Sequence, residues 1–206
     1  MSNAIRIHNF PRSGHCHRVE LFANLTGINH ELVFVDLAAG EHKKEPFLSL
    51  NPAGKVPVIE DDETVVRDSN AILVYLARKY APDWLPTDPA EEAEVQRFLS
   101  MAANELANGP AAARLVTVFG AQLDAEKAQA IAAYVFDILE THLDGREWLV
   151  GQTPSVADVA IYSYTAHAPE GNVSLDPYPN IRALLKRIEA LPGFVAMPAT
   201  KVGLAA

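Results

Sequence analysis

The sequence predicts an α+β protein in two parts, with a βαβαββα domain over residues 1–80 and an all-helical domain over residues 90–206. Two observations carry this prediction. Short runs rich in β-branched and aromatic residues alternate with helix-like segments only in the first part. Beyond it, Ala, Leu, Glu and Gln dominate and no strand-like run returns. Between the parts, APDWLPTDP at residues 81–89 holds three prolines, which predicts a linker.

The chain begins with a predicted strand, helix and strand. AIRIHNF at residues 4–10 has strand character and is followed by Pro11. Ser13 fits the N-cap of a helix that stops near Gly27, and HELVFVDL at residues 30–37 predicts the second strand. Because a β-α-β unit brings its strands back in the same direction, we expect a parallel pair.

The rest of the first part predicts two further strands and two further helices. Residues 40–50 carry a short helix in a less regular stretch. VPVI at residues 56–59 and TVVR at residues 64–67 flank an acidic turn, and so short a connection favours antiparallel pairing. DSNAILVYLARKY at residues 68–80 has helical spacing behind a polar start, which predicts a helix.

The second part predicts helices only. We expect two long helices within residues 90–144, separated near residues 120–124. A further helix opens at Ser155, and another covers residues 179–191. In the sequence S-x-x-D, the Ser155 side chain caps the helix and Asp158 reaches back to the cap amide, so both are predicted to be structural.

Composition limits the kind of partner this chain can have. The formal net charge is −9, with nine basic and ten acidic residues up to Tyr80 and eight and sixteen beyond it. An acidic surface repels phosphate backbones, which argues against nucleic-acid binding. No apolar run reaches the length of a membrane span, no secretory signal is visible, and one cysteine excludes an internal disulfide framework. These features predict a cytoplasmic protein without membrane association.

Three stretches resemble the cytosolic glutathione S-transferases. NPAGKVPVIEDDETVVRDSNAILVYL at residues 51–76 is similar to their glutathione-binding stretch, and GQTPSVADVAIYSY at residues 151–164 to their helical capping motif. RSGHCHRV at residues 12–19 is similar to the bacterial, serine-type, theta/zeta-like members. The resemblance implies a thioredoxin-like first domain in the glutathione S-transferase fold, glutathione as co-substrate, no metal, a small electrophilic substrate and a homodimer.

The resemblance also assigns glutathione-binding residues. It implies a cis bond before Pro57 and a Val56 main chain that pairs with the cysteine of glutathione, as in a short β-augmentation. Ser69 would hold the γ-glutamyl carboxylate, and Asp68 the ammonium, although many members have a longer acidic or amide side chain at that position. A plain turn proline and an ordinary helix cap remain the alternatives.

Two further residues are weaker candidates for the tripeptide. In similar proteins the residues at Lys55 and His42 face glutathione, at its cysteinyl backbone or glycine carboxylate. The alternative for each is a solvated surface side chain. We therefore expect them to line the glycine end of the site if the resemblance holds.

Ser13 and Cys16 stand where a thioredoxin-like redox protein carries two cysteines. The resemblance makes Ser13 the catalytic residue, donating a hydrogen bond to the glutathione thiolate, with a simple N-cap as the alternative. Cys16 is expected to be buried and inert. His15 and His17 flank it, but residues two apart point about 200° apart on a helix, which argues against a metal site.

The acceptor pocket is expected along residues 104–116, the first long helix of the second part. The candidates are Asn108, Ala112, Arg114 and Leu115, and a cation at Arg114 would hold an acidic acceptor. Core-facing residues at helical spacing would look the same.

The leading hypothesis is therefore a glutathione transferase. The alternatives left open are a glutathione-dependent isomerase of the maleylacetoacetate type, a disulfide reductase, and a non-catalytic glutathione-binding stress protein. The residues at positions 14 and 15 weaken the isomerase, since similar enzymes carry serine and cysteine there.

Overall fold

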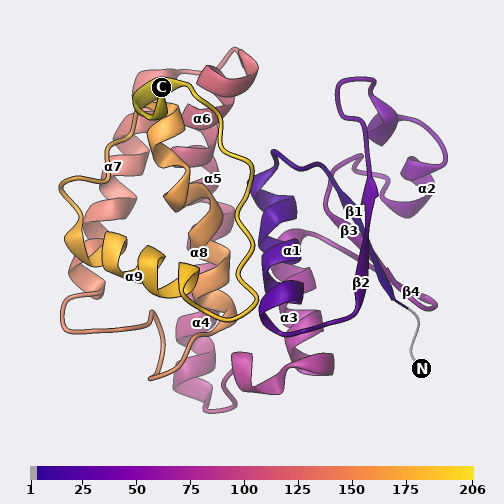
Figure 1. Cartoon of the computed structure of the whole chain (residues 1–206), viewed down its shortest axis with the longest axis horizontal. Coiled ribbons are helices and arrows are strands. Elements are labelled where there is room, and N and C mark those ends of the chain that lie inside the picture. The colour runs from indigo at the N-terminus through magenta and orange to yellow at the C-terminus, as the bar shows by residue number, and fades with distance from the viewer. Residues whose placement is uncertain (1–3) are drawn as a thin grey trace. The chain divides into compact units, whose positions relative to one another are not determined.

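The computed structural model describes residues 4–206 and divides the chain into two compact units (Figure 1). The first unit holds the residues up to Pro82 together with Pro192–Pro198. The second unit holds Asp83–Leu191 and Ala199–Ala206. Among the residues described, no helix is both long and apolar enough to cross a membrane.

A four-stranded mixed sheet forms the centre of the first unit, in the order β2-β1-β3-β4. Its strands are β1 Ile5–Asn9, β2 His30–Phe34, β3 Val58–Asp61 and β4 Thr64–Arg67. β1 and β2 are parallel, and β3 and β4 are antiparallel, as the sequence predicted. β1 and β3 also pair, in antiparallel orientation. Alternate residues of a strand point to opposite faces, so β1 contributes to two layers of the core.

Helices cover both faces of this sheet. α1 (Gly14–Leu25) and α3 (Ser69–Tyr80) pack against each other on one face, and α2 (Phe47–Leu50) lies on the other (Figure 1). α1 buries Val19 and Phe22 completely, because residues three apart share a helical face. The predicted βαβαββα order is confirmed.

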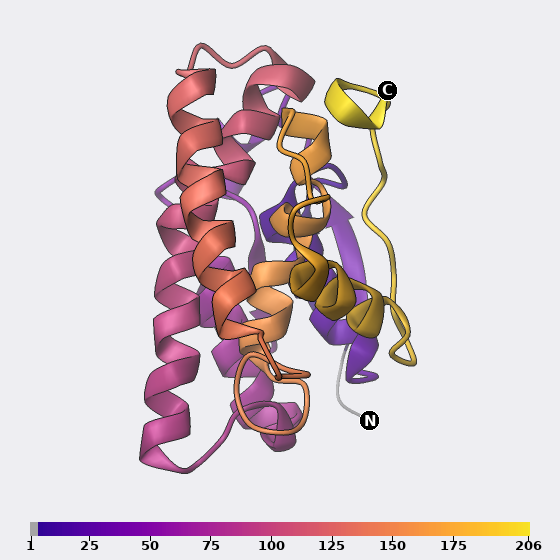
Figure 2. The same ribbon diagram turned by 90° about the vertical axis from the view of Figure 1, so that its left-hand side faces the viewer.

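The second unit is built of helices. Their bounds are α4 Pro89–Ala103, α5 Glu105–Asn108, α6 Pro110–Phe119, α7 Ala125–His142, α8 Val156–Ala166 and α9 Pro179–Glu189. Single 3₁₀ turns occur in this unit at Ala168–Gly171 and Gly203–Ala205, at Pro82–Trp84 where the two units join in sequence, and in the first unit at Glu41–Lys43. α7 packs against α5 and α6, with buried residues at helical spacing along its length (Figure 2).

The prediction of one long helix ahead of residue 120 is wrong. The chain forms α4, α5 and α6 there, with breaks at Asn104 and Gly109. Pro110 starts α6 because its missing N–H and its ring do not fit a helix interior. A Cβ at Gly109 would lie 2.8 Å from the main-chain nitrogen of Ala132, so this break also lets α7 approach closely.

The last part of the chain differs from the predicted domain division, which placed all of residues 90–206 in one helical domain. Pro192–Pro198 belongs to the first unit. His17 Nε2 lies 2.9 Å from the carbonyl oxygen of Val195, which fixes this segment beside α1. The second unit ends instead with Ala199–Ala206.

The capping box predicted for α8 is present. The Ser155 side chain accepts from the first turn, and the Ser155 amide donates to Asp158 Oδ2 at 2.8 Å. Asp158 Oδ1 also accepts from the Leu149 amide at 2.9 Å. Burial raises the pKa of Asp158 to about 6, against the effect of these hydrogen bonds. Both residues therefore tie the start of α8 to the preceding loop.

Candidate functional site

Three segments of the first unit meet at the ends of its strands: the start of α1, the loop at residues 51–57 and the start of α3. His15 Nδ1 lies 3.3 Å from Ser69 Oγ, which joins the two helices. The β3–β4 register pairs Val58 with Arg67. The loop at residues 51–57 therefore leads into the end of β3 that pairs with the end of β4, just ahead of α3.

Ser13 caps the start of α1. Its Oγ accepts a hydrogen bond from the amide of Cys16 at 3.3 Å, with the extended backbone of an N-cap residue. This bond uses an acceptor site of the hydroxyl, so its proton can point either to the Cys16 sulfur or to a ligand. The side chain is half-buried, so that proton remains within reach of a ligand. Capping and donation to a ligand are thus compatible at Ser13.

Cys16 is fully buried in the first turn of α1. Its Sγ accepts from the amide of Phe10 at 3.4 Å. Burial raises the pKa of the Cys16 thiol to about 11, outweighing hydrogen bonds from Ser13 and Phe10. Because the thiolate is the reactive form, this sulfur is an inert thiol at neutral pH.

The loop at residues 51–57 is held from within and presents an open peptide group. Asn51 Nδ2 donates to the carbonyl of Lys55 at 2.7 Å. The peptide bond between Val56 and Pro57 is cis, as expected. Within residues 4–206 the main-chain N–H and C=O of Val56 have no hydrogen-bond partner. An extended peptide could pair there as a short added strand.

His42 and Lys55 lie on segments that touch each other. A Cβ at Gly54, whose φ is +56°, would lie 2.6 Å from the carbonyl oxygen of His42. Lys43 Nζ donates to the Gly54 carbonyl at 2.9 Å. His42 Nδ1 is buried without a partner among the residues described, and burial and Lys43 lower its pKa. The Lys55 side chain is exposed.

Asp68 and Ser69 form the start of α3. Asp68 has a positive φ of 73° and caps the helix, with Oδ1 accepting from the amides of Asn70 at 2.9 Å and Ala71 at 3.0 Å. Its Oδ2 is not used by this cap. Ser69 is the first residue of the helix, so its amide has no partner within α3. This end of α3 suits an anion, since amides and the helix dipole point toward it.

Arg18 is a part of this site that the sequence analysis missed. It lies on α1, is only 1% exposed, and reaches α3 through Nη1. Nη1 donates to Ser69 Oγ at 2.8 Å and to Asn70 Oδ1 at 2.7 Å. The available signal was its position one turn before Phe22 on the apolar face of α1, where an arginine needs polar partners.

Burial, Arg18 and Lys55, in that order, lower the pKa of His15 to about 3. His15 is therefore neutral at physiological pH. Both side chains carry positive charges close enough to act on this imidazole. A site of this kind favours an anionic ligand.

The expectation that Arg114 faces an acceptor is wrong. Its side chain is 2% exposed, and its Nε donates to Glu170 Oε2 at 2.6 Å within the second unit. Ala112 is half-buried and Leu115 exposed on α6, whereas Arg114 points about 200° away from Ala112 around the helix. Asn108 is exposed on α5 and donates to the carbonyl of Asn104 at 2.9 Å.

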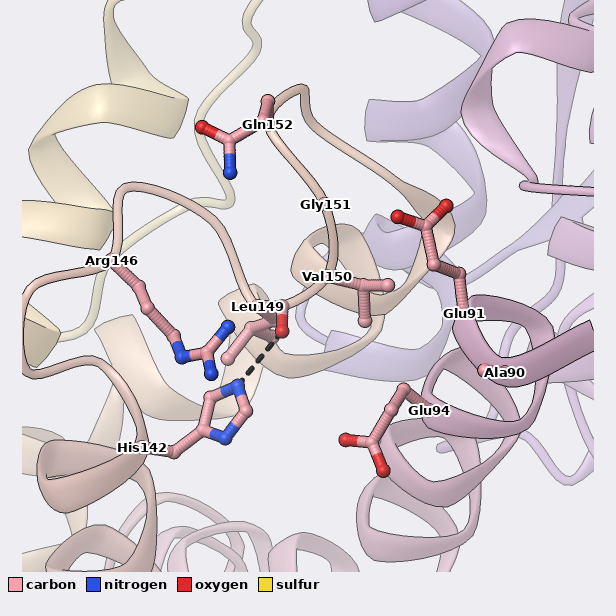
Figure 3. Close-up of a pocket in the computed structure, with 9 residues that line it drawn as sticks. All are labelled: Ala90, Glu91, Glu94, His142, Arg146, Leu149, Val150, Gly151 and Gln152. Atoms are coloured by element: carbon pink, nitrogen blue, oxygen red, sulfur yellow. Dashed lines mark hydrogen bonds between the residues drawn. The ribbon is translucent and has the colours of Figure 1, made fainter. Parts of the chain in front are cut away.

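A separate hollow of about 360 Å³ lies in the second unit (Figure 3). His142 Nε2 lies 2.8 Å from the carbonyl oxygen of Leu149 at its floor. None of the residues predicted for binding or catalysis lines it. Its lining residues are Ala90, Glu91, Glu94, His142, Arg146, Leu149, Val150, Gly151 and Gln152.

Comparison with known proteins places the chain in a family. Residues 12–79 match the family model for the glutathione S-transferase N-terminal domain, and residues 86–192 match that for the C-terminal domain. The chain therefore belongs to the glutathione S-transferase family, and its fold is the fold of that family.

Individual relatives agree with this assignment. Glutathione S-transferase 3 of Zea mays is 31% identical over 205 residues, covering 92% of this chain and 91% of the relative. Maleylpyruvate isomerase of Ralstonia sp is 29% identical over 192 residues, covering 87% and 90%. A crystal structure of a glutathione S-transferase from Pseudomonas fluorescens superimposes with a TM-score of 0.90 at 31% identity, covering 95% of this chain and 99% of that one.

Proposed function

We propose that this protein is a glutathione transferase, which binds glutathione in the first unit and adds its thiolate to a small electrophile. The observation that carries the proposal is the main chain of Val56, which has no hydrogen-bond partner among the residues described, together with the helix start at Ser69, in a chain of this family. The main chain of Val56 offers an edge for pairing with a peptide, and the start of α3 offers a site for an anion. Together they match a short peptide that has a carboxylate at one end.

Glutathione would lie along these groups in an extended form. Its cysteinyl peptide groups pair with the main chain of Val56, and its γ-glutamyl carboxylate meets the hydroxyl and amide of Ser69. The γ-glutamyl ammonium pairs with Oδ2 of Asp68, which the helix cap does not use. Lys55 and His42 face the glycine end, where a cation and a buried imidazole nitrogen suit a carboxylate.

Ser13 would lower the pKa of the bound thiol by donating its hydroxyl proton to sulfur. An ordinary thiol has a pKa near 8.5, so only about 3% is thiolate at pH 7, and a decrease of about two units needs about 2.7 kcal/mol. One hydrogen bond to a charged group contributes about 1.5–3 kcal/mol. The start of α1 adds about 0.3–1 kcal/mol. These two contributions suffice for ionisation, and no protein base is required.

The acceptor would be a small electrophile held by the second unit. Asn108, Ala112 and Leu115 remain the proposed contacts, since Asn108 and Leu115 are exposed and Ala112 is half-buried. Arg114 is removed from this set by its buried ion pair.

The proposal includes a cytoplasmic homodimer that acts in detoxification. Its support is the family assignment. Sedimentation of the purified protein tests the dimer directly.

A glutathione-dependent isomerase is the second candidate, favoured by the maleylpyruvate isomerase of Ralstonia sp among the relatives. In that reaction the thiolate adds to the substrate and later leaves, so the same Ser13 and Ser69 would serve. A disulfide reductase using Cys16 is disfavoured by the burial of its thiol.

The test begins with titration calorimetry of the protein with glutathione, with an S-alkylated analogue as competitor. Turnover is then measured with a chloro-nitrobenzene, a maleyl acid and a mixed disulfide. Binding of glutathione with turnover of the chloro-nitrobenzene supports the transferase. Binding with turnover of the maleyl acid alone supports the isomerase. Binding without turnover would identify a non-catalytic glutathione-binding protein, and no binding at millimolar glutathione would overturn the proposal.

Replacement of Ser13 by alanine tests the proposed activation of sulfur. Because one hydrogen bond to the thiolate is lost, we expect the pKa of bound glutathione to rise by about one to two units. The ultraviolet absorbance of the thiolate as a function of pH measures it. Ser13→Thr keeps a hydroxyl and is the matched control. An unchanged titration curve in Ser13→Ala would remove Ser13 from this role.

A further inference from the structure

A buried arginine joins the two helices that bound the proposed glutathione site. Arg18 of α1 donates from Nη1 to Ser69 Oγ at 2.8 Å and to Asn70 Oδ1 at 2.7 Å on α3. Arg18 is 1% exposed and Ser69 is 3% exposed. α1 and α3 pack side by side on one face of the sheet (Figure 1). The guanidinium therefore lies directly behind the hydroxyl that would meet the γ-glutamyl carboxylate.

The hydrogen bond from Arg18 limits where the Ser69 proton can point. A serine hydroxyl has one proton and two acceptor lone pairs, whereas a guanidinium only donates. Arg18 fills one lone pair of Oγ, so the Ser69 proton must point away from it. The remaining neighbour is His15 Nδ1 at 3.3 Å, a long contact to a neutral imidazole. A carboxylate at the start of α3 would be a stronger acceptor for that proton than His15.

Charge acts in the same direction as this geometry. Arg18 and Lys55 both act on His15 as cations, so two positively charged side chains lie near the imidazole that contacts the Ser69 hydroxyl. A hydroxyl that accepts from a cation is also polarised into a better donor, because hydrogen bonds in a chain strengthen each other. α3 is twelve residues long, and its dipole adds to this effect.

We infer that Arg18 is a positioning residue for glutathione: it holds the Ser69 hydroxyl as a donor to the γ-glutamyl carboxylate and makes the site selective for ligands that carry this carboxylate. The inference rests on the proposed function, because it assigns that carboxylate to Ser69. It predicts that Arg18 affects binding of the tripeptide far more than the chemical step. It also predicts that Arg18 acts only on ligands with the carboxylate.

The test compares two ligands on two proteins. Glutathione and γ-aminobutyryl-cysteinylglycine, which lacks only the γ-glutamyl carboxylate, are titrated into the wild type and Arg18→Met by calorimetry. We expect Arg18→Met to weaken glutathione binding about tenfold, as for one hydrogen bond to a charged group, and to leave binding of the analogue within about twofold. In turnover, KM for glutathione should rise while kcat at saturating glutathione stays nearly constant.

Two controls separate positioning from a general loss of structure. Arg6→Met removes the same charge from the same unit, where Arg6 pairs with Glu31 and Glu60 instead, and should leave both affinities unchanged. Arg18→Lys keeps a cation and should recover part of the selectivity. If Arg18→Met does not fold, the same two ligands are titrated into Arg18→Lys. Full or partial loss of the preference for glutathione over the analogue supports the inference. Unchanged affinity for both ligands overturns it.

The outcomes also distinguish this inference from the proposed function. If the wild type binds neither ligand, the proposed function fails. If the wild type binds glutathione and Arg18→Met weakens both ligands equally, Arg18 is only structural and the inference is overturned. In a Ser69→Ala background, Arg18→Met should have little further effect on glutathione binding, since the hydroxyl through which it acts is gone.

Discussion

Among residues 4–206, each unit buries one arginine on a helix, and the two arginines have different partners. Arg114 of the second unit is 2% exposed and donates to the carboxylate of Glu170, itself 2% exposed. Arg18 of the first unit is 1% exposed and donates to a hydroxyl and an amide oxygen. The Arg114–Glu170 bond joins opposite charges. The two bonds of Arg18 join a positive charge to the neutral side chains of Ser69 and Asn70.

This difference separates a structural arginine from one suited to a ligand site. Glu170 also accepts from His167 Nδ1 at 2.8 Å and from the Thr200 amide at 2.9 Å, so its carboxylate is surrounded by donors of its own unit. The pair satisfies its own charges. The bonds from Arg18 Nη1 orient Ser69 and Asn70, and its positive charge acts on His15. A buried arginine that donates to residues at the start of a neighbouring helix can thus prepare a site for an anion from outside.

The largest expected effect concerns the pair in the second unit. Glu170→Gln removes one partner of a buried ion pair and leaves the Arg114 charge in the interior. We expect the free energy of unfolding to fall by about 3–5 kcal/mol, measured by urea denaturation. The double variant Arg114→Met/Glu170→Leu should recover most of this loss, because no charge remains buried. A loss of under about 1 kcal/mol in Glu170→Gln would show that the pair is not buried as described.

Acid should weaken the same pair reversibly. Burial alone would raise the pKa of Glu170, but hydrogen bonds from Thr200, His167 and Arg114 outweigh it and lower the pKa to about 2, from 4.5. A lowered pKa in the folded state means that this stability is present above pH 4.5 and is lost as the pH falls toward 2. Thermal unfolding across this range should therefore show a steeper decline in the wild type than in Glu170→Gln.

Asp158 contributes to this pH dependence with the opposite sign. Its pKa is raised to about 6, so the stability linked to it is present below its ordinary pKa and declines as the pH rises through 6. Glu170→Gln retains Asp158, and the difference between the two pH curves therefore isolates Glu170. Parallel curves would contradict the lowered pKa of Glu170.

The smallest expected effect concerns a neutral partner of Arg18. Asn70→Ala removes one acceptor of Arg18 but keeps Ser69, so we expect stability to fall by about 1 kcal/mol and glutathione affinity to change by less than about threefold. Denaturation and calorimetry measure the two. A loss as large as that of Glu170→Gln would mean that neutral acceptors matter as much as the carboxylate does, which would remove the distinction between the two arginines.

Much of the fold could be predicted from the sequence. The strands and helices of the first unit follow from local periodicity, and the starts of α1, α3 and α8 follow from Ser13, Asp68 and Ser155 as caps. The break between α5 and α6 could also have been predicted, because Gly109 and Pro110 mark it in the sequence. It was missed because the residues on both sides of it have high helix propensity.

The candidate site could be predicted only in part. The motif around Val56, Asp68 and Ser69 is contiguous, so resemblance to a known family identified it. The assignment of Arg114 failed because helical spacing alone did not show which face of α6 is buried. The angle between Ala112 and Arg114 excludes a shared face, and the same angle had argued against a metal site at the histidines of α1.

By itself, the sequence determined the secondary structure, the helix caps, the order of the strands along the chain and the family to which the chain belongs. These depend on residues close together in the chain, where propensity and spacing decide. Only the tertiary structure decided which acceptor each buried arginine meets. Arg18 and Ser69 are 51 residues apart and Arg114 and Glu170 are 56 apart. No local rule links residues at such separations, because packing of whole helices brings them together.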